Sequence, residues 1–106
     1  MAASTKPLIL AILARGEIYG YQIIQNVIDL SGGTLEWSEG MLYPVLHRME
    51  KDNLVRSQWR IIDNGRRRKY YSLTELGKKE LEKEKKQWIN VHKLLTKLWE
   101  PVPGFK

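Results

Sequence analysis

The sequence predicts a mainly α-helical chain with one β-hairpin and a long C-terminal helix. Apolar residues recur at helical spacing through residues 6–52, and an alternation of period two replaces that spacing from Leu54. A second helical pattern then runs from Thr74 to Trp99 with no breaker after Gly77. At 106 residues and 42% hydrophobic content, we expect one folded unit with a modest core.

The first two predicted helices lie within residues 6–16 and 17–33. Pro7 falls in the first turn of the first helix, where proline is tolerated, and Gly16 suits a left-handed cap at its end. The second helix carries an apolar stripe at helical spacing and ends at the Ser-Gly-Gly of residues 31–33. The stripe consists of Ile23, Ile24, Val27 and Leu30.

A third helix is predicted from Ser38 to about Asp52. Ser38 is a good N-cap, and Glu39 stands in the first turn, where the helix dipole favours an anion. Pro44 lies inside the pattern and removes a backbone hydrogen bond to the carbonyl of Gly40. We therefore expect the start of this helix to be kinked or rescued by its surroundings.

A β-hairpin is predicted from Leu54 to Leu73. Residues 55–62 alternate in the manner of a strand, and residues 67–73 are rich in strand-forming side chains. Asn64-Gly65 between them accepts the positive φ angles of a type I′ turn. The basic run at residues 66–69 is therefore expected at the tip and on the returning arm of the hairpin.

Thr74 is the expected cap of the last helix, which carries a possible oligomer seam. Trp88, Val91, Leu95 and Leu98 step by three, four and three, as in the a and d positions of a coiled coil, and Leu81 lies one heptad before Trp88. A helix this long extends beyond what three short helices and a hairpin can cover. We therefore expect a homodimer formed through this seam.

Three helices followed by a hairpin is the element order of a winged helix-turn-helix domain. In that fold the third helix enters the major groove, and the hairpin, called the wing, contacts the adjacent backbone or minor groove. We expect residues 1–73 to form this DNA-binding domain and residues 74–100 to form a dimerisation helix. Residues 101–106 read as a frayed tail.

Charge and composition favour a nucleic-acid partner. Eighteen Lys and Arg against twelve Asp and Glu give a net charge of +6, which favours polyanions. The absence of Cys excludes disulfides and thiolate metal sites, and no apolar run is long enough for a signal peptide or membrane span. We expect a soluble cytoplasmic protein without a membrane partner.

Catalytic and metal-binding motifs are not recognisable in the chain. His47 and His92 belong to different predicted helices, and no Asp or Glu spacing is typical of a metal site. No phosphate-binding loop or nucleophile motif occurs either. We expect neither a cofactor nor an enzymatic activity.

Three stretches resemble the PadR family of transcriptional regulators. SEGMLYPVLHRMEKDNLV at residues 38–55 resembles the family signature Ser-x-Gly-x-Leu-Tyr-Pro-x-Leu-x-Arg-Leu-Glu-x-x-Gly-Leu-Ile. GRRRKYYSLTELG at residues 65–77 is similar to the family's wing and entry to the terminal helix, and YGYQI at residues 19–23 to its second-helix start. The resemblance implies that Pro44 is a family feature. Met49 and Asn53 replace the usual Leu and Gly, and both exchanges are compatible with the fold.

Two groups of residues are predicted to contact duplex DNA. The wing cations can neutralise phosphates and release counterions, and we favour those nearest the tip, Arg66 and Arg67, over Arg68 and Lys69. The plainer alternative is that this basic hairpin is only a solvated face. The second group lies at the exposed end of the third helix or nearby and consists of Ser38, Glu39, Gly40, Tyr43 and Arg48.

Individual members of these groups have alternatives. Gly40 would let the DNA backbone approach closely and the Tyr43 hydroxyl would reach a phosphate, whereas Tyr43 could instead be a core aromatic with its hydroxyl at the surface. Tyr19 and Gln22, at the start of the second helix, are candidates for backbone contacts, with ordinary packing as the alternative.

A ligand site is implied by resemblance to the short, drug-responsive members of the family, the lactococcal multidrug-resistance repressors. These dimerise through the terminal helix, where a Trp at the place of Trp88 lines an apolar gap and stacks on a flat, often cationic, molecule. The candidate ligand contacts here are Trp88, Val91 and His92. His92 departs from the acidic residue of some relatives, which argues against a preference for cations. The alternative is a Trp packed at a dimer seam without a pore.

The function we expect is that of a dimeric repressor of transcription. Two third helices would occupy successive major grooves of an operator, two wings would hold the flanking backbone, and a flat aromatic ligand between the protomers would release the DNA. Two alternatives use the terminal helix differently, as a protein-interaction module or as a ligand sensor whose DNA binding is secondary.

Overall fold

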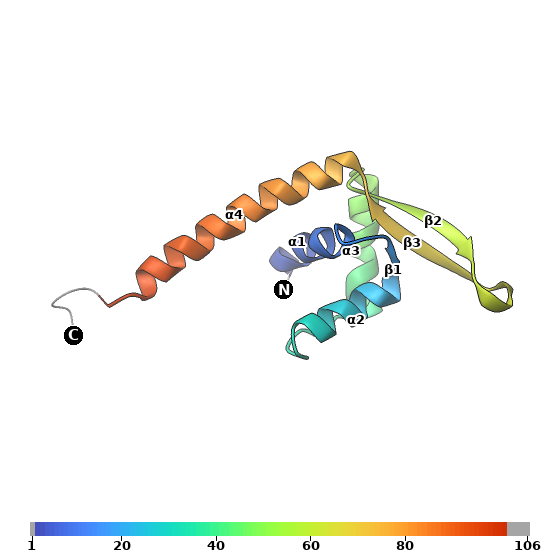
Figure 1. The fold of residues 1–106 in the computed structure, drawn as a ribbon, viewed down its shortest axis with the longest axis horizontal. Helices are drawn as coiled ribbons and strands as arrows, with labels where there is room; N and C mark the ends of the chain where they lie inside the picture. The colour runs from blue at the N-terminus through green and yellow to red at the C-terminus, as the bar shows by residue number, and fades with distance from the viewer. Residues whose placement is uncertain (1, 102–106) are drawn as a thin grey trace.

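The computed structural model describes residues 2–101, and its architecture confirms the predicted fold class. Four helices lie toward one end of a small antiparallel sheet, and the last helix and the hairpin extend from the domain in different directions (Figure 1). The expected frayed tail falls, apart from Pro101, outside the described residues. The elements are α1 Ala2–Leu13, β1 Ile18–Tyr19, α2 Gly20–Leu30, α3 Glu39–Lys51, β2 Val55–Ile61, β3 Arg67–Leu73 and α4 Glu75–Trp99.

The sheet has three strands in the order β1-β3-β2, and both pairings are antiparallel. The hairpin strands pair from Val55↔Leu73 to Ile61↔Arg67, as the alternation predicts. Strand β1 was not predicted, because two residues are too short to show an alternation and Ile18 and Tyr19 become a strand only by pairing with β3.

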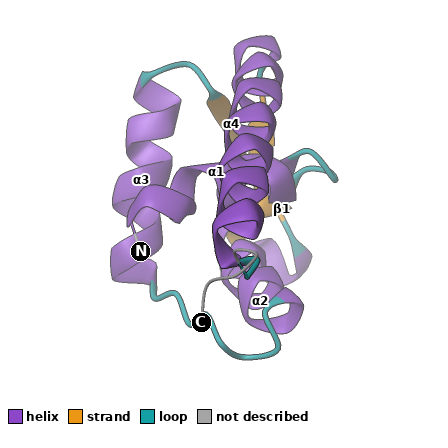
Figure 2. Ribbon diagram, turned by 90° about the vertical axis from the view of Figure 1, so that its left-hand side faces the viewer, coloured by secondary structure: helices purple, strands orange, loops and turns teal. Residues whose placement is uncertain are grey.

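The core lies between α1, α2, α3 and the base of the hairpin. Figure 2 looks along α4 and shows α3 and α2 on different sides of it, with α1 behind. Trp37, in the loop before α3, and Leu81, on α4, complete this cluster. The most deeply buried apolar side chains are Ile9, Leu10, Ile23, Leu42, Leu46, Met49, Val55 and Tyr71.

Two details of the first helices differ from the prediction. Helix α1 begins at Ala2 and not at Lys6, so Pro7 lies in its interior and Gly16 follows three residues after its end. The burial of Ile9 and Leu10 holds this helix against the core despite the hydrogen bond that proline removes. Leu30, predicted on the apolar stripe, is the last residue of α2 and is 66% exposed, whereas Ile23, Ile24 and Val27 are buried.

Helix α3 has the predicted start. The Ser38 hydroxyl accepts a hydrogen bond from the Met41 amide at 3.2 Å, as an N-cap does. The helix continues through Pro44 to Lys51, and Asn53, with φ 62°, then turns the chain into β2. Asn53 thus adopts the left-handed conformation that the glycine of the family signature would adopt at this position.

The hairpin connection is longer than the predicted two-residue turn. Asn64 and Gly65 do adopt positive φ, 67° and 72°. However, Asp63–Gly65 forms a short 3₁₀ turn, the Gly65 amide donates to the Ile62 carbonyl at 3.2 Å, and the Ile62 amide donates to that of Arg66 at 2.7 Å. Five residues, 62–66, therefore separate the paired strands, and Arg66 belongs to this loop.

The start of α4 is fastened to the link between α3 and β2. The Thr74 hydroxyl accepts from the Gly77 amide at 3.0 Å, which confirms the predicted cap, and donates to the Asn53 carbonyl at 2.5 Å. The Thr74 amide donates to the Leu54 carbonyl at 3.1 Å. Helix α3, the hairpin and α4 thus meet at one junction.

Leu81 is placed differently from the prediction. It was expected on the dimer seam, but it is 6% exposed and packs in the core of its own chain. The cause is the approach of α1 to α4, which Lys6 reinforces by an ion pair with Glu80 at 2.6 Å. Beyond Leu81, no described residue of α4 is buried.

Candidate nucleic-acid interface

An open groove lies between the start of α2, helix α3 and the wing, and has a volume of about 520 Å³. Its walls are aromatic and its wing side is basic. Most of the aromatic walls come from Tyr19 and Tyr21 at α2, Tyr43 and His47 on α3, and Trp59 on the wing, and the cations are Arg67, Arg68 and Lys69. An apolar groove with cations along one side suits a polyanion that also presents flat or apolar groups.

The wing cations divide between the two faces of the hairpin. Arg67 and Lys69 pair with Ile61 and Trp59 across the ladder, so both lie on the face of Trp59. Their charged groups lie 5.3 and 6.0 Å from the Trp59 ring centroid. Arg66 is exposed in the tip loop and does not line the groove, although it was favoured with Arg67 in the prediction.

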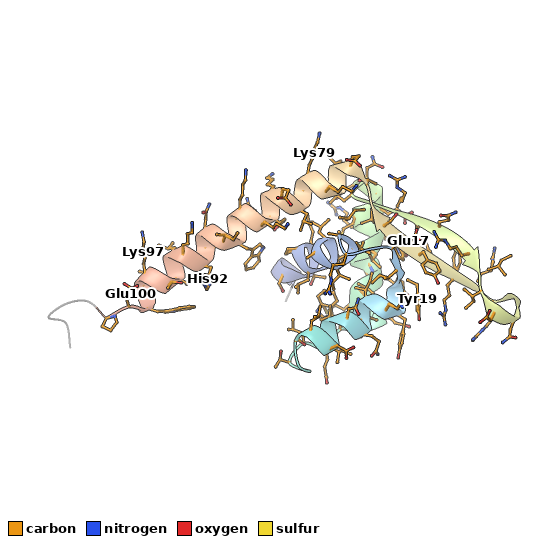
Figure 3. All side chains as sticks on the ribbon, viewed as in Figure 1. Glu17, Tyr19, Lys79, His92, Lys97 and Glu100 are labelled. Carbon is orange, nitrogen blue, oxygen red and sulfur yellow. The ribbon has the colours of Figure 1, made fainter. Side chains whose placement is uncertain are left out.

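The opposite face of the wing is held against the start of α2 by cation–π and edge-to-face aromatic contacts. Arg68 lies 4.2 Å from the Tyr19 ring, which meets the Tyr70 ring edge-on at 5.6 Å. Arg60 covers Tyr70 at 4.9 Å and forms an ion pair with Glu17. Figure 3 shows Glu17 and Tyr19 between the helical domain and the hairpin. These contacts hold the wing at a set angle to the helices.

Tyr43 packs against the start of α2. Its hydroxyl occupies the space beside Gly20, where a Cβ atom would lie 2.5 Å from it. Burial, followed by the charge of Glu39, raises the pKa of the Tyr43 hydroxyl, which therefore remains a neutral hydrogen-bond donor. The side chain is half-buried and still lines the groove, so it combines the core role and the surface role that the sequence left open.

The first turn of α3 is open to a partner. Ser38, Glu39 and Gly40 are exposed, and a Cβ added at Gly40 would approach nothing nearer than the Ser38 hydroxyl at 3.9 Å. These three residues do not line the groove, and neither do two other candidates. Arg48 is exposed and pairs with Asp52 at 3.4 Å, and Gln22 is half-buried.

Five groove residues were missed as DNA-binding candidates, namely Gly20, Tyr21, His47, Trp59 and Tyr71. His47 lies one helical turn after Tyr43, and that i, i+4 spacing could have indicated a shared face. Trp59 was treated only as a strand former. Tyr71, in the groove floor, has a hydroxyl with no hydrogen-bond partner among the described residues, and burial, with Glu50 and Tyr43, raises its pKa to about 12.

Replacing Gly20 by Ala tests the position of Tyr43. The added methyl is expected to push the phenol end of Tyr43 out of its place, because that end is the nearest atom and the ring can rotate. We expect about tenfold weaker duplex binding, the loss of roughly one good hydrogen bond, with thermal stability lowered only slightly. Tyr43→Phe is the matched control and should lower binding similarly. Unchanged affinity in both variants would remove Tyr43 from the interface.

The outer half of α4 presents a second candidate surface. Trp88, Val91, Leu95 and Leu98 are all exposed, as are Ile89, Leu94 and Trp99. An apolar cavity of about 390 Å³ lies between α1 and α4, with Leu8, Ala11, Leu35 and Trp88 in its lining. The Trp88 indole N–H donates to Glu84 at 3.2 Å, and Lys6 lies 3.7 Å from the same carboxylate. His92 projects from α4 farther along (Figure 3).

Within residues 2–101, no group of three or more His, Asp or Glu side chains could hold a metal ion. None of the described helices is both long enough and apolar enough to cross a bilayer.

Comparison with known proteins places this geometry among transcriptional regulators. Residues 9–83 match the model of the transcriptional regulator PadR-like family. A PadR family regulator from Clostridium difficile R20291 is 35% identical, with a TM-score of 0.79 over 92% of this chain and 99% of its own. A PadR-like regulator from Bacillus cereus is 30% identical, with a TM-score of 0.83 over 95% and 96%. The transcriptional regulator Rv3488 of Mycobacterium tuberculosis is 37% identical over 69% of this chain and 64% of its own length.

Proposed function

This chain belongs to the PadR-like family of transcriptional regulators, which act by binding DNA, and from that premise we propose that it is a dimeric repressor released by a small molecule. The observation that carries the proposal is the groove in which Tyr43 and His47 of α3 and the basic wing face the same space. The unpaired apolar face of α4 supports the dimer.

The first turn of α3 would meet base edges, and the wing would hold the backbone. Ser38, Glu39 and Gly40 lie at the end of the helix that winged proteins present to the major groove, and Tyr43 and Tyr19 stand beside them. Arg67 and Arg68 would contact phosphates from the groove, and Arg66 would do so from the tip. In this proposal residues 1–73 are the DNA-binding unit.

The dimer would form through residues 74–100. Leu81, Trp88 and Leu95 follow one stripe at heptad spacing, and Leu81 is covered by its own core while Trp88 and Leu95 are not. A stripe that is buried at its inner end and continues outward uncovered fits a second copy of the same helix. Val91 and Leu98 widen the surface that this copy would cover.

A ligand would bind beside Trp88 at the centre of the dimer. The hydrogen bond to Glu84 sets the orientation of the indole, whose face borders the apolar cavity between α1 and α4. Val91 and His92 would complete the site from the adjoining turn. A flat aromatic molecule suits such a wall by stacking, and it would release DNA only if it prefers a different spacing of the two protomers.

Duplex binding across a salt series tests the DNA-binding proposal. The promoter upstream of the protein's own gene is compared with a scrambled duplex by fluorescence anisotropy. If about six phosphates are contacted per dimer, log affinity should fall with log salt at a slope of about −5. Arg67→Ala removes two contacts per dimer, so the slope should become shallower by about two.

Arg56→Ala is the control for this experiment, because Arg56 is an exposed arginine of the same hairpin outside the groove. It should leave affinity and slope nearly unchanged. Equal, weak binding to both duplexes would contradict a sequence-specific regulator. Equal effects of the two substitutions would show that net charge, and not the groove, determines binding.

A further inference from the structure

Trp59 is a large apolar side chain that the proposed function does not use. It is 57% exposed, although Val55 and Tyr71 on the same face of the hairpin are buried. That face runs outward from the core, and Trp59 is its first exposed aromatic residue. The indole borders the groove, and the charged groups of Arg67 and Lys69 lie near its ring.

Two cations lie near the indole, with their charged groups 5.3 and 6.0 Å from its ring centroid. Arg67 lies toward the tip and Lys69 toward the core, two residues apart on one face of β3, which corresponds to about 7 Å along the strand. Lys69 is the direct cross-strand neighbour of Trp59, and Arg67 is a diagonal one. The result is a flat apolar surface with two cations beside it, all three lining the groove.

One strand of duplex DNA presents a complementary row. Its backbone alternates charged phosphates with deoxyribose rings, whose C–H groups are apolar. Cations bound to two consecutive phosphates would place the indole against the sugar between them. The contact needs no particular base, because every nucleotide has the same sugar and phosphate.

Existing contacts of Lys69 leave it available for this role. Its ammonium group is 3.8 Å from a carboxylate oxygen of Glu50, and the other oxygen of Glu50 already accepts a hydrogen bond from Ser57 at 2.5 Å. An ion pair at that distance on a partly exposed lysine is weak. The flexible stem of the lysine can therefore turn its charge toward a phosphate.

We propose that Trp59 is a DNA-backbone contact residue that packs on one deoxyribose, whose two flanking phosphates pair with Arg67 and Lys69. The inference rests on the proposed function in so far as duplex DNA occupies the groove. It adds an apolar contribution to affinity, which is insensitive to salt, beside the ionic contribution of the wing.

Substitutions at Trp59 separate the two contributions. Trp59→Ala should weaken duplex binding at least about tenfold, because the exposed indole face is no longer removed from water, while the salt slope stays as in the wild type. Arg67→Ala and Lys69→Ala should each make the slope shallower by about two per dimer. Trp59→Phe should retain part of the affinity. Ile61→Ala, on the same face and outside the groove lining, is the matched control and should bind like the wild type.

All variants are measured on the promoter duplex and on the scrambled duplex, with thermal unfolding to confirm that each is folded. Because the contact is independent of the base, Trp59→Ala should weaken both complexes by the same factor. That result would support the inference even if the promoter were not preferred, which would count against the proposed repressor instead.

Two results would overturn the inference. If Trp59→Ala bound both duplexes as tightly as the wild type, the indole would remain exposed to water in the protein–DNA complex. A slope that becomes shallower in Trp59→Ala would show that the indole only positions the cations. Methylphosphonates at two consecutive backbone positions provide the complementary test, since their effect should largely disappear in a combined Arg67→Ala, Lys69→Ala variant.

Discussion

Leu95→Glu is expected to convert the proposed dimer to a monomer and to lower operator affinity by at least about a hundredfold. Leu95 lies on the stripe that continues from the buried Leu81, and a partner helix would enclose it. An unpaired carboxylate in that position costs about 3–5 kcal/mol. Separate protomers also lose the gain from engaging two half-sites together.

Sedimentation velocity measures the dimer, and anisotropy on the promoter duplex measures the second effect. Asn90→Glu is the matched control, because it adds the same charge to an exposed position on the opposite face of α4 from Leu81. It should remain dimeric and bind DNA. A dimer that survives Leu95→Glu would place the interface elsewhere on the chain.

Gly77→Ala is expected to destabilise the folded protein by about 3 kcal/mol, a large part of the roughly 5–15 kcal/mol typical of a domain. Gly77 is buried in the first turn of α4, and a Cβ atom there would overlap the Leu54 carbonyl oxygen, which is backbone. That carbonyl also accepts the Thr74 amide, so moving it disturbs the junction between α3, β2 and α4.

Urea unfolding compares Gly77→Ala with Gly40→Ala. Both glycines lie in the first turn of a helix, but a Cβ at Gly40 would point into open space. Gly40→Ala should therefore be neutral or stabilising by up to about 1 kcal/mol, since alanine is the better helix former. Equal unfolding midpoints for the two variants would mean that the junction accommodates the added methyl group at position 77 without a loss of stability.

Local signals in the sequence were sufficient to predict the starts of the helices that have a side-chain N-cap. Ser38 and Thr74 accept hydrogen bonds from the amides three residues later, and these caps mark the starts of α3 and α4 wherever the helices pack. The period-two alternation likewise located the hairpin, and Asn64 and Gly65 took the predicted positive φ angles. The winged order of elements follows from these signals alone.

Other features depend on contacts between residues distant in the sequence. Strand β1 exists because Ile18 and Tyr19 pair with β3. Leu81 lies in the core of its own chain and not on an exposed seam, because α1 packs against it. Pro7 stands inside α1 because burial of the following residues outweighs one lost hydrogen bond.

The groove itself belongs to this second class. His47 and Trp59 are unremarkable within their own helix and strand, and they border one space with Tyr43 only when the wing folds beside α3. The sequence by itself determined where α3, α4 and the two hairpin strands begin, because caps, turns and periodicity act over a few residues. Tertiary structure alone decided which side chains share a surface, because burial and strand pairing join segments that the local pattern does not connect.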